Sequence, residues 1–330
     1  MPLQYRSTST LVEEHTDAIN CVALSPDGLF VASGSTDKRI VVWSLSSGQA
    51  IHRLVTHSAV LSLLWRSSPS RIICGTADGT LITAAFNEEN IYVSGFSAHS
   101  KPIECLSLSK GTTASRHLAT AAHNVVNIWS SVENDTYWDY GDTLDAPPST
   151  PYSASHSVII TSVQWMNDPS ADCLVTAYLH HGIICSRRGT GSIEVLWSIH
   201  LPLCGACNIS PANDTLAVCN ITSGFDVYAI PSGLRRLVLE VPSEPPGMAL
   251  PIVYIHKGTM LLGGASNGKV RLWDARSGDI VQTLRYHGKF DPLLIQCVAE
   301  NPDTFLLATG SSDPGVPNSI QVWELRDVAE

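Results

Sequence analysis

The 330-residue sequence has few charged side chains, and most of them are acidic. Asp, Glu, Lys and Arg make up 15% of the residues, whereas an ordinary soluble protein has about 25%. With 30 acidic and 20 basic residues, the net charge is −10 at pH 7. Because a nucleic-acid backbone is polyanionic, this balance disfavours nucleic acid as a general partner.

Long apolar segments are also missing. The longest candidate, Met248–Ile255, is far shorter than the roughly 18 residues of a membrane span and contains Pro251. The first residues, MPLQYRSTSTLVEEH, lack the apolar stretch of a secretion signal. We therefore expect an intracellular protein, cytoplasmic or nuclear, without a transmembrane segment and with its nine cysteines reduced.

What the sequence does contain is a decayed internal repeat. Its clearest copy, His15–Trp43, opens with a His and alternates apolar residues through strands separated by tight turns. Six further copies follow with different losses, and seven copies in 330 residues give about 47 residues each. The later copies open at His57, His99, His156, Gly205, Leu250 and His287.

The repeat resembles the WD repeats of β-propellers over nearly the whole chain. A literal Trp-Asp pair, Trp273-Asp274, ends the third strand of the sixth copy. A six-residue spacing from turn to strand Trp recurs in Asp37/Trp43 and His123/Trp129. The resemblance implies an all-β, seven-bladed propeller of four-stranded antiparallel blades, with residues 1–330 forming a single domain. It also implies that residues 1–13 supply the outer strand that completes the last blade.

Members of this family often connect the strands of a blade through a buried hydrogen-bonded set. The set consists of the opening His, a Ser or Thr of the second strand, the turn Asp and the third-strand Trp. Two copies carry all four types: His15, Ser33, Asp37 and Trp43 in the first, and His287, Thr309, Asp313 and Trp323 in the last. Other copies have lost members, with Ala84, Arg187 and Tyr228 at Trp positions and His123 and His181 at turn positions. The middle blades are therefore predicted to rely on apolar packing.

No group of residues predicts catalysis, a cofactor or a metal site. Cys204 and Cys207 form a lone CxxC without the second ligand pair that zinc requires. His180 and His181 are adjacent, so in an extended chain they point in opposite directions; His181 is interpreted as a turn residue and His180 as facing the surface. The repeat offers no strand–turn–helix unit that could carry the nucleophilic serine of a hydrolase.

Arg187-Arg188-Gly189-Thr190 offers an alternative function. It is similar to the Arg-Arg-Gly of phosphoinositide-binding propellers, but here the pair ends a third strand instead of preceding a first strand. A hairpin after Arg188 accounts for the sequence equally well. Peripheral binding of phosphoinositides through Arg187 and Arg188 is thus the runner-up, and an enzyme is a second alternative.

The main prediction is a non-catalytic protein-interaction scaffold, a monomeric propeller within a hetero-complex whose partners are unidentified. The family's binding face, transferred by position, gives an apolar surface unless loops bury it. Its members are Leu61, Glu104, Ile159, His180, Leu203, Met248, Leu250 and Leu294.

A second candidate surface is the long inter-blade segment 130–155. It places acidic residues among Tyr137, Trp138 and Tyr140, which would suit a basic peptide. A tolerated insertion is the alternative.

Overall fold

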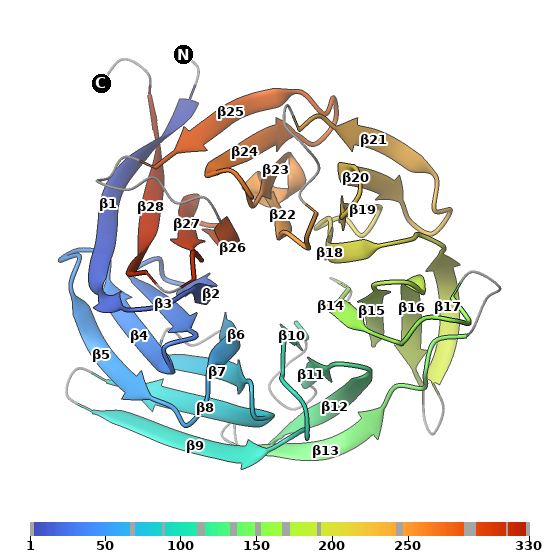
Figure 1. The fold of residues 1–330 in the computed structure, drawn as a ribbon, viewed down its shortest axis with the longest axis horizontal. Helices are drawn as coiled ribbons and strands as arrows, with labels where there is room; N and C mark the ends of the chain where they lie inside the picture. Colours follow the sequence, from blue (N-terminus) through green and yellow to red (C-terminus); the bar gives the residue numbers. More distant parts are fainter. Residues whose placement is uncertain are drawn as a thin grey trace. The chain divides into compact units, whose positions relative to one another are not determined.

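The computed structural model describes residues 3–66, 70–87, 90–110, 116–132, 137–148, 153–166, 172–189, 193–241, 247–286, 295–314 and 316–327. The chain divides into two compact units, Met1–Ala98 with Ile255–Glu330, and His99–Tyr254. The described residues form seven four-stranded sheets, which we number as blades one to seven in chain order (Figure 1).

Blades one, two, six and seven belong to the first unit, apart from the start of blade six, since the division falls inside β22. Blade one contains β2 (Ile19–Leu24), β3 (Phe30–Ser35), β4 (Arg39–Ser44) and β5 (Ala50–Val55). Blade two contains β6 (Val60–Trp65), β7 (Arg71–Thr76), β8 (Thr80–Phe86) and β9 (Ile91–Ser97). Blade six contains β22 (Ile252–Ile255), β23 (Met260–Gly263), β24 (Lys269–Asp274) and β25 (Ile280–Arg285). Blade seven contains β26 (Ile295–Asn301), β27 (Leu306–Ser311), β28 (Asn318–Asp327) and β1 (Leu3–His15).

Blades three, four and five form the second unit. Blade three contains β10 (Cys105–Leu108), β11 (His117–Ala122), β12 (Val125–Val132) and β13 (Tyr137–Thr143). Blade four contains β14 (Ile160–Trp165), β15 (Cys173–Tyr178), β16 (Gly182–Arg188) and β17 (Ile193–Ile199). Blade five contains β18 (Cys204–Ile209), β19 (Thr215–Asn220), β20 (Gly224–Ala229) and β21 (Arg235–Leu239).

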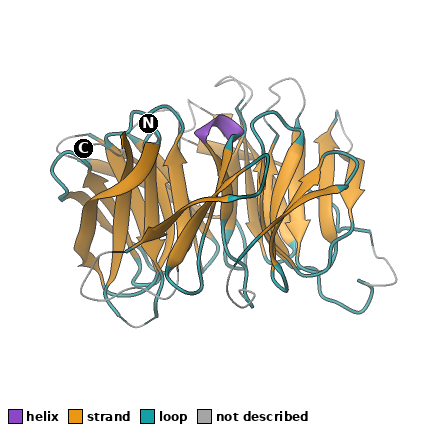
Figure 2. Ribbon diagram, turned by 90° about the horizontal axis from the view of Figure 1, so that it is seen from above, coloured by secondary structure: helices purple, strands orange, loops and turns teal. Residues whose placement is uncertain are grey.

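This architecture confirms the predicted fold class, a seven-bladed β-propeller of four-stranded antiparallel blades. Within the described ranges the helical structure is limited to one short 3-10 turn, η1 (His256–Gly258), while strands and loops make up the rest (Figure 2). Within the long segment 130–155, β12 runs to Val132 and β13 runs from Tyr137 to Thr143.

The N-terminal strand completes the last blade, as predicted. β1 (blue) lies beside β28 (red) in Figure 1, and the two pair antiparallel from Leu3 with Asp327 to Leu11 with Ile320. Gln282 of β25 adds two hydrogen bonds to the backbone of Tyr5, one from the Tyr5 N–H (2.9 Å) and one to its carbonyl (2.7 Å). The first and last segments of the chain thereby share one sheet.

Each unit has its own apolar core between neighbouring blades. In the first unit, Leu11 of β1 packs with Trp43 of blade one and Ile320 of β28. In the second unit, one cluster joins blades three and four and another joins blades four and five. Alternating buried positions along the strands supply these clusters, because successive side chains of a strand face opposite sides of its sheet.

Candidate functional site

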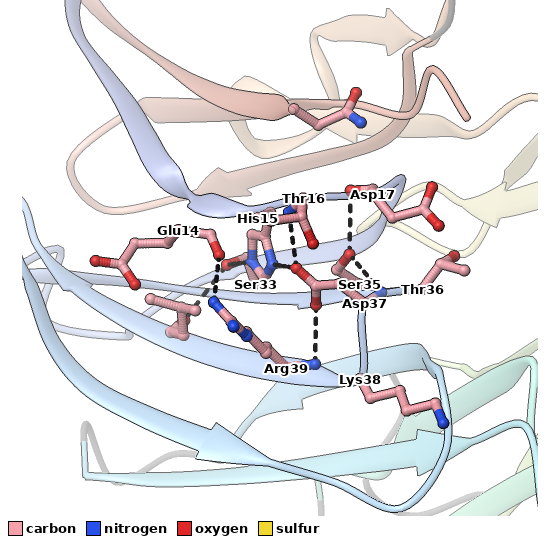
Figure 3. A network of polar contacts seen from close by, with 12 residues as sticks. Glu14, His15, Thr16, Asp17, Ser33, Ser35, Thr36, Asp37, Lys38 and Arg39 are labelled. Carbon is pink, nitrogen blue, oxygen red and sulfur yellow. Dashed lines mark hydrogen bonds and ion pairs between the residues drawn. The ribbon is translucent and has the colours of Figure 1, made fainter. Parts of the chain in front are cut away.

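The blade-one network shows how an intact blade is held together (Figure 3). The His15 ring contacts Asp37 Oδ2 through Nδ1 (2.9 Å) and Ser33 Oγ through Nε2 (2.8 Å). Trp43 donates its indole N–H to the same Ser33 oxygen (3.0 Å). A proton on Nδ1 satisfies all three contacts, since Ser33 then donates to Nε2 and accepts from Trp43. The hydroxyl of the second strand is therefore the hub of the set.

The carboxylate of this set is held in its charged form. Burial of Asp37 opposes ionisation, but hydrogen bonds from His15 and from the backbone N–H groups of Thr16 and Arg39 outweigh it and lower the pKa of Asp37. The charge in turn fixes the orientation of the His15 ring.

Blade three keeps the hub although its turn Asp is missing. Thr120 Oγ1 contacts His99 Nε2 (2.7 Å) and accepts the indole N–H of Trp129 (2.8 Å). The prediction that the middle blades lack such hydrogen bonds is therefore wrong for blade three. The reason is that the hydroxyl, not the carboxylate, makes the contacts to both rings.

Blade seven contains a residue that the sequence reasoning missed. Trp323 donates to Thr309 Oγ1 (3.0 Å), as expected, and the hydroxyl of Tyr286 donates to the same oxygen (2.6 Å). Asp313 exchanges hydrogen bonds with Asn318 through its backbone N–H and carbonyl. The predicted His287 lies outside the described residues.

Three blades have lost the third-strand Trp, and in the two of them that have an opening His, this His is exposed. Blade two has Ala84 at the Trp position and His57 at the surface. In blade four, Ser186 pairs with Leu174 as Trp43 pairs with Val31, so Ser186 occupies the Trp position, the assignment of Arg187 is wrong by one residue, and His156 lies at the surface. In blade four the hub hydroxyl remains, as Thr176 Oγ1, which is buried without a hydrogen bond and interacts with the phenol of Tyr178. Loss of the indole thus coincides with release of the imidazole.

Strand register identifies the residue of blade four that replaces the turn Asp. Ser33 pairs with Val41, and Thr176 pairs with Ile184 in the same way. Four residues after each hub hydroxyl come Asp37 and His180, respectively. The assignment of His181 to the turn position is therefore wrong by one residue, because the loop between β15 and β16 has the same length as that between β3 and β4.

The opening histidines correspond as well. Thr36 donates its N–H to Ala18 O, and Leu179 donates to Ile159 O, so His156 stands where His15 stands in blade one. In blade four the rings of His156 and His180 stack, with centroids 4.1 Å apart and planes 18° apart. A stack of two imidazoles has replaced an imidazole–carboxylate pair.

This stack forms part of a cavity of about 340 Å³ in the second unit. Four of its seven described lining residues are histidines, and none is acidic. Three segments supply the lining: the loop before β14, the β15–β16 turn and the loop after β17. The lining residues are His156, His180, His181, Gly182, His200, Leu201 and Pro202.

His181 is the most buried of these imidazoles, at 8% exposed. Its Nδ1 atom is buried without a hydrogen-bond partner, and its ring meets Tyr178 edge-on at 6.3 Å. Burial, followed by the charge of His156, lowers the pKa of His181; burial, His156 and His181 together lower the pKa of His180. These two imidazoles are therefore neutral at pH 7.

Gly182 allows the chain to pass closely beneath the cavity. Its φ of +76° lies in the left-handed region, and a Cβ there would collide with the carbonyl oxygen of Ile199. A glycine is required at this position, which fixes the path of the turn that carries His180 and His181.

Two of the predicted surface residues of the second unit, Ile159 and Leu203, belong to segments that flank this cavity. Leu179 donates its N–H to Ile159 O (2.9 Å), and its own carbonyl accepts the N–H of Cys204 (3.0 Å). Ile159, Leu179 and Leu203 are all partly exposed. We call Ile159, Leu179, Leu203 and the seven cavity residues the blade-four face.

Other predicted residues lie elsewhere. Glu104 and Met248 are exposed in the second unit, and Leu61 is partly buried in the first. Leu250 is only 3% exposed, so its prediction as a surface residue is wrong: its N–H donates to Cys219 Sγ and the side chain is enclosed. Leu294 lies outside the described residues.

The aromatic residues of segment 130–155 separate in the same way. Tyr137 is exposed, whereas Trp138 is 8% exposed on β13, paired with Ser131 of β12. Trp138 is therefore a packing residue and not a contact for a partner, because alternate residues of β13 face the neighbouring sheet.

Both arginines of the Arg-Arg-Gly motif have acidic neighbours. Arg187 pairs with Glu194 across β16 and β17 (2.6 Å). Arg188 donates to Asp142 of blade three (3.1 Å) and contacts His117, which itself lies 3.5 Å from Asp172. These contacts give the pair a structural role in joining strands and blades.

The cysteine pair is buried in β18. Burial raises the pKa of Cys204, and that of Cys207 to about 12, so both remain thiols. Across the described ranges, no group of three or more His, Cys, Asp or Glu is arranged to hold a metal ion. Nor does any helix in those ranges have the length and apolarity needed to cross a membrane.

Comparison with known proteins agrees with the repeat and the blades. The family "WD domain, G-beta repeat" matches residues 6–44 and 48–82, the segments that build blade one and most of the first three strands of blade two. The chain thus carries matched WD repeats within its first 82 residues, and its seven blades show a β-propeller.

Curated relatives share a short segment with it. Ribosome biogenesis protein bop1-A of Xenopus laevis is 31% identical over 65 residues, 20% of this chain and 9% of the relative. The BOP1 homolog of Drosophila melanogaster is 31% identical over 71 residues, 22% of this chain and 9% of the relative. The matched segment thus spans under a tenth of the length of either relative.

Proposed function

We propose that this chain is a non-catalytic protein-interaction scaffold, or a subunit of a larger complex, that holds a partner protein on the blade-four face. The observation that carries the proposal is that the cavity lies beside apolar side chains that are partly exposed. Backbone hydrogen bonds connect the segments that carry these side chains, from Ile159 through Leu179 to Cys204. Concave sites with apolar walls and a few polar groups are typical binding sites.

The matched WD repeats and the propeller fold support a scaffold. The relatives are named for ribosome biogenesis, but they share with this chain only 65 to 72 residues. The proposal therefore covers protein binding and does not include a role in ribosome biogenesis.

A quantitative affinity purification tests it. The tagged chain is compared with Leu203→Asn, which removes an apolar side chain at a φ of +51° that Asn tolerates. Val55→Asp on β5, where Val55 is 73% exposed in the other unit, is the matched control.

We expect proteins that co-purify with the unaltered chain and the control to be lost at least about fivefold with Leu203→Asn, while the melting temperature stays unchanged. Equal capture by all three chains would contradict binding at this face.

A further inference from the structure

Blade four has lost the carboxylate that an intact blade carries, and none of the described cavity residues replaces it. In blade one, Asp37 faces the opening His15 at 2.9 Å. In blade four the corresponding residues are two stacked imidazoles, His180 and His156. A carboxylate entering from outside would therefore restore the missing partner of a histidine.

We infer that the histidine cavity of the blade-four face binds an acidic side chain, Asp or Glu, of an extended segment of the partner protein. This inference rests on the proposed function and names the chemistry of the partner. His181 lines the cavity, and its buried Nδ1 has no hydrogen-bond partner among the described residues, so this atom is an unused donor or acceptor. A buried polar atom of this kind costs free energy until a partner meets it.

The remaining walls favour a peptide over a free anion. Leu201, Pro202 and Gly182 contribute apolar surface next to the imidazoles. The volume of about 340 Å³ exceeds that of one carboxyl group and accommodates its side chain with part of a neighbouring residue. An acidic residue beside an apolar one meets both kinds of wall.

The charges around the cavity make binding depend on pH. The titratable groups that face the stack and His181 are His156 from the loop before β14, Tyr178 from β15, the two histidines of the turn, and His200 after β17. None of the described lining residues is acidic, and burial lowers the pKa of His180 and of His181. A bound carboxylate favours their protonated form, so binding takes up protons and tightens as the pH falls.

The test measures fluorescence anisotropy of a fluorescein-labelled Gly-Ala-Leu-Glu-Leu-Ala-Gly peptide with the full chain, beside the same peptide carrying Gln for Glu. We expect the Glu peptide to bind roughly tenfold more tightly at pH 5.5 than at pH 7.5, and the Gln peptide to bind weakly at both. Inorganic phosphate is added as a competitor, because it offers negative charge without a side chain.

Two variants locate the binding. His180→Asp supplies the carboxylate from within the chain and should weaken binding of the Glu peptide at pH 5.5 by about tenfold or more. His57→Gln alters the exposed opening histidine of blade two, outside the cavity, and should leave binding unchanged. If His180→Asp melts below the unaltered chain, His181→Gln is measured in its place with the same expectation.

Equal binding of the Glu and Gln peptides, binding that does not change with pH, or full retention in His180→Asp would overturn the inference. If the Glu and Gln peptides bind equally and inorganic phosphate displaces both, the cavity is a phosphate site instead. If cellular partners are lost with Leu203→Asn but kept with His180→Asp, the proposed function holds and the acidic contact is refuted.

Discussion

His180 of blade four stands in the place that Asp37 occupies in blade one, four residues beyond the hub hydroxyl of the second strand. Where Asp37 holds the His15 ring in the blade, His180 stacks on His156 at the surface. One change of residue type thereby converts a structural hydrogen-bonded pair into part of a cavity wall. The blades share one arrangement of hydrogen-bonding residues. Where a blade lacks members of this set, other side chains become available at the surface for binding.

The Asp37–His15 pair is predicted to contribute to acid stability. The pKa of Asp37 is lowered in the folded protein, so its contribution is complete above the unfolded value near 4 and is lost as the pH falls below it. Asp37→Asn should cost about 1–3 kcal/mol at pH 7 and flatten the loss of stability below pH 4. Urea denaturation from pH 7 to pH 3 measures both; a parallel decline in the two proteins would refute the assignment.

The hub hydroxyls of blades three and four are predicted to contribute differently to the free energy of unfolding. Thr120→Val removes the shared partner of His99 and Trp129 and should destabilise the protein by about 2–4 kcal/mol. Thr176→Val removes a buried hydroxyl that has no hydrogen bond and should cost less than about 1 kcal/mol. Equal losses in chemical denaturation would show that the hydroxyl is not the hub.

Glu300 is predicted to destabilise the protein at alkaline pH. Burial raises its pKa to about 7, although the backbone N–H of His256 donates to its carboxyl oxygen at 2.7 Å. Because the folded pKa exceeds the unfolded one, stability falls as the pH rises from about 4.5 to 7 and then levels off.

Glu300→Gln should therefore stabilise the protein by about 1–2 kcal/mol at pH 8 and have little effect at pH 4. Melting curves at the two pH values check this, with Glu324→Gln at an exposed ion pair as the control. A stabilisation that is the same at both pH values would exclude titration of Glu300 as its cause.

The closing strand is predicted to be essential for stability. Deleting residues 1–12 removes most of β1, including Leu11, which is 1% exposed in the core shared by blades one and seven. The deletion also exposes the edge of β28. The melting temperature should fall by at least about 5 °C in calorimetry; an unchanged transition would mean that β1 does not close the blade.

The fold was accessible from the sequence because the repeat kept its spacing while it lost its side chains. The turn-to-Trp offset of Asp37 and Trp43 recurs in His123 and Trp129, and this offset depends on strand length, not on the residue at either end. The completing strand could be predicted for the same reason. Tyr286, by contrast, reaches Thr309 from outside any motif position, so the pattern contained no signal for it.

The candidate site was harder to predict because it consists of departures from the repeat. Of the predicted binding residues, His180 lines the cavity, while His156, His181 and His200 were overlooked or interpreted as structural. The signal was present in the missing Trp of blade four, whose position Ser186 occupies, but the consequence of this loss for His156 depends on packing. Leu250 and Trp138 show the opposite error: Leu250 was placed at the surface by its position in the repeat and Trp138 by the composition of segment 130–155, but both side chains are enclosed.

Site-specific photocrosslinking tests the claim of a partner on the blade-four face most directly. The full chain would carry p-benzoylphenylalanine in place of Leu201, which lines the cavity, or in place of Val55, which is exposed on β5 of the other unit. We predict a crosslinked protein adduct from the Leu201 position after irradiation in cells, and none from the Val55 position. No adduct at Leu201, or the same adducts at both positions, would contradict the account.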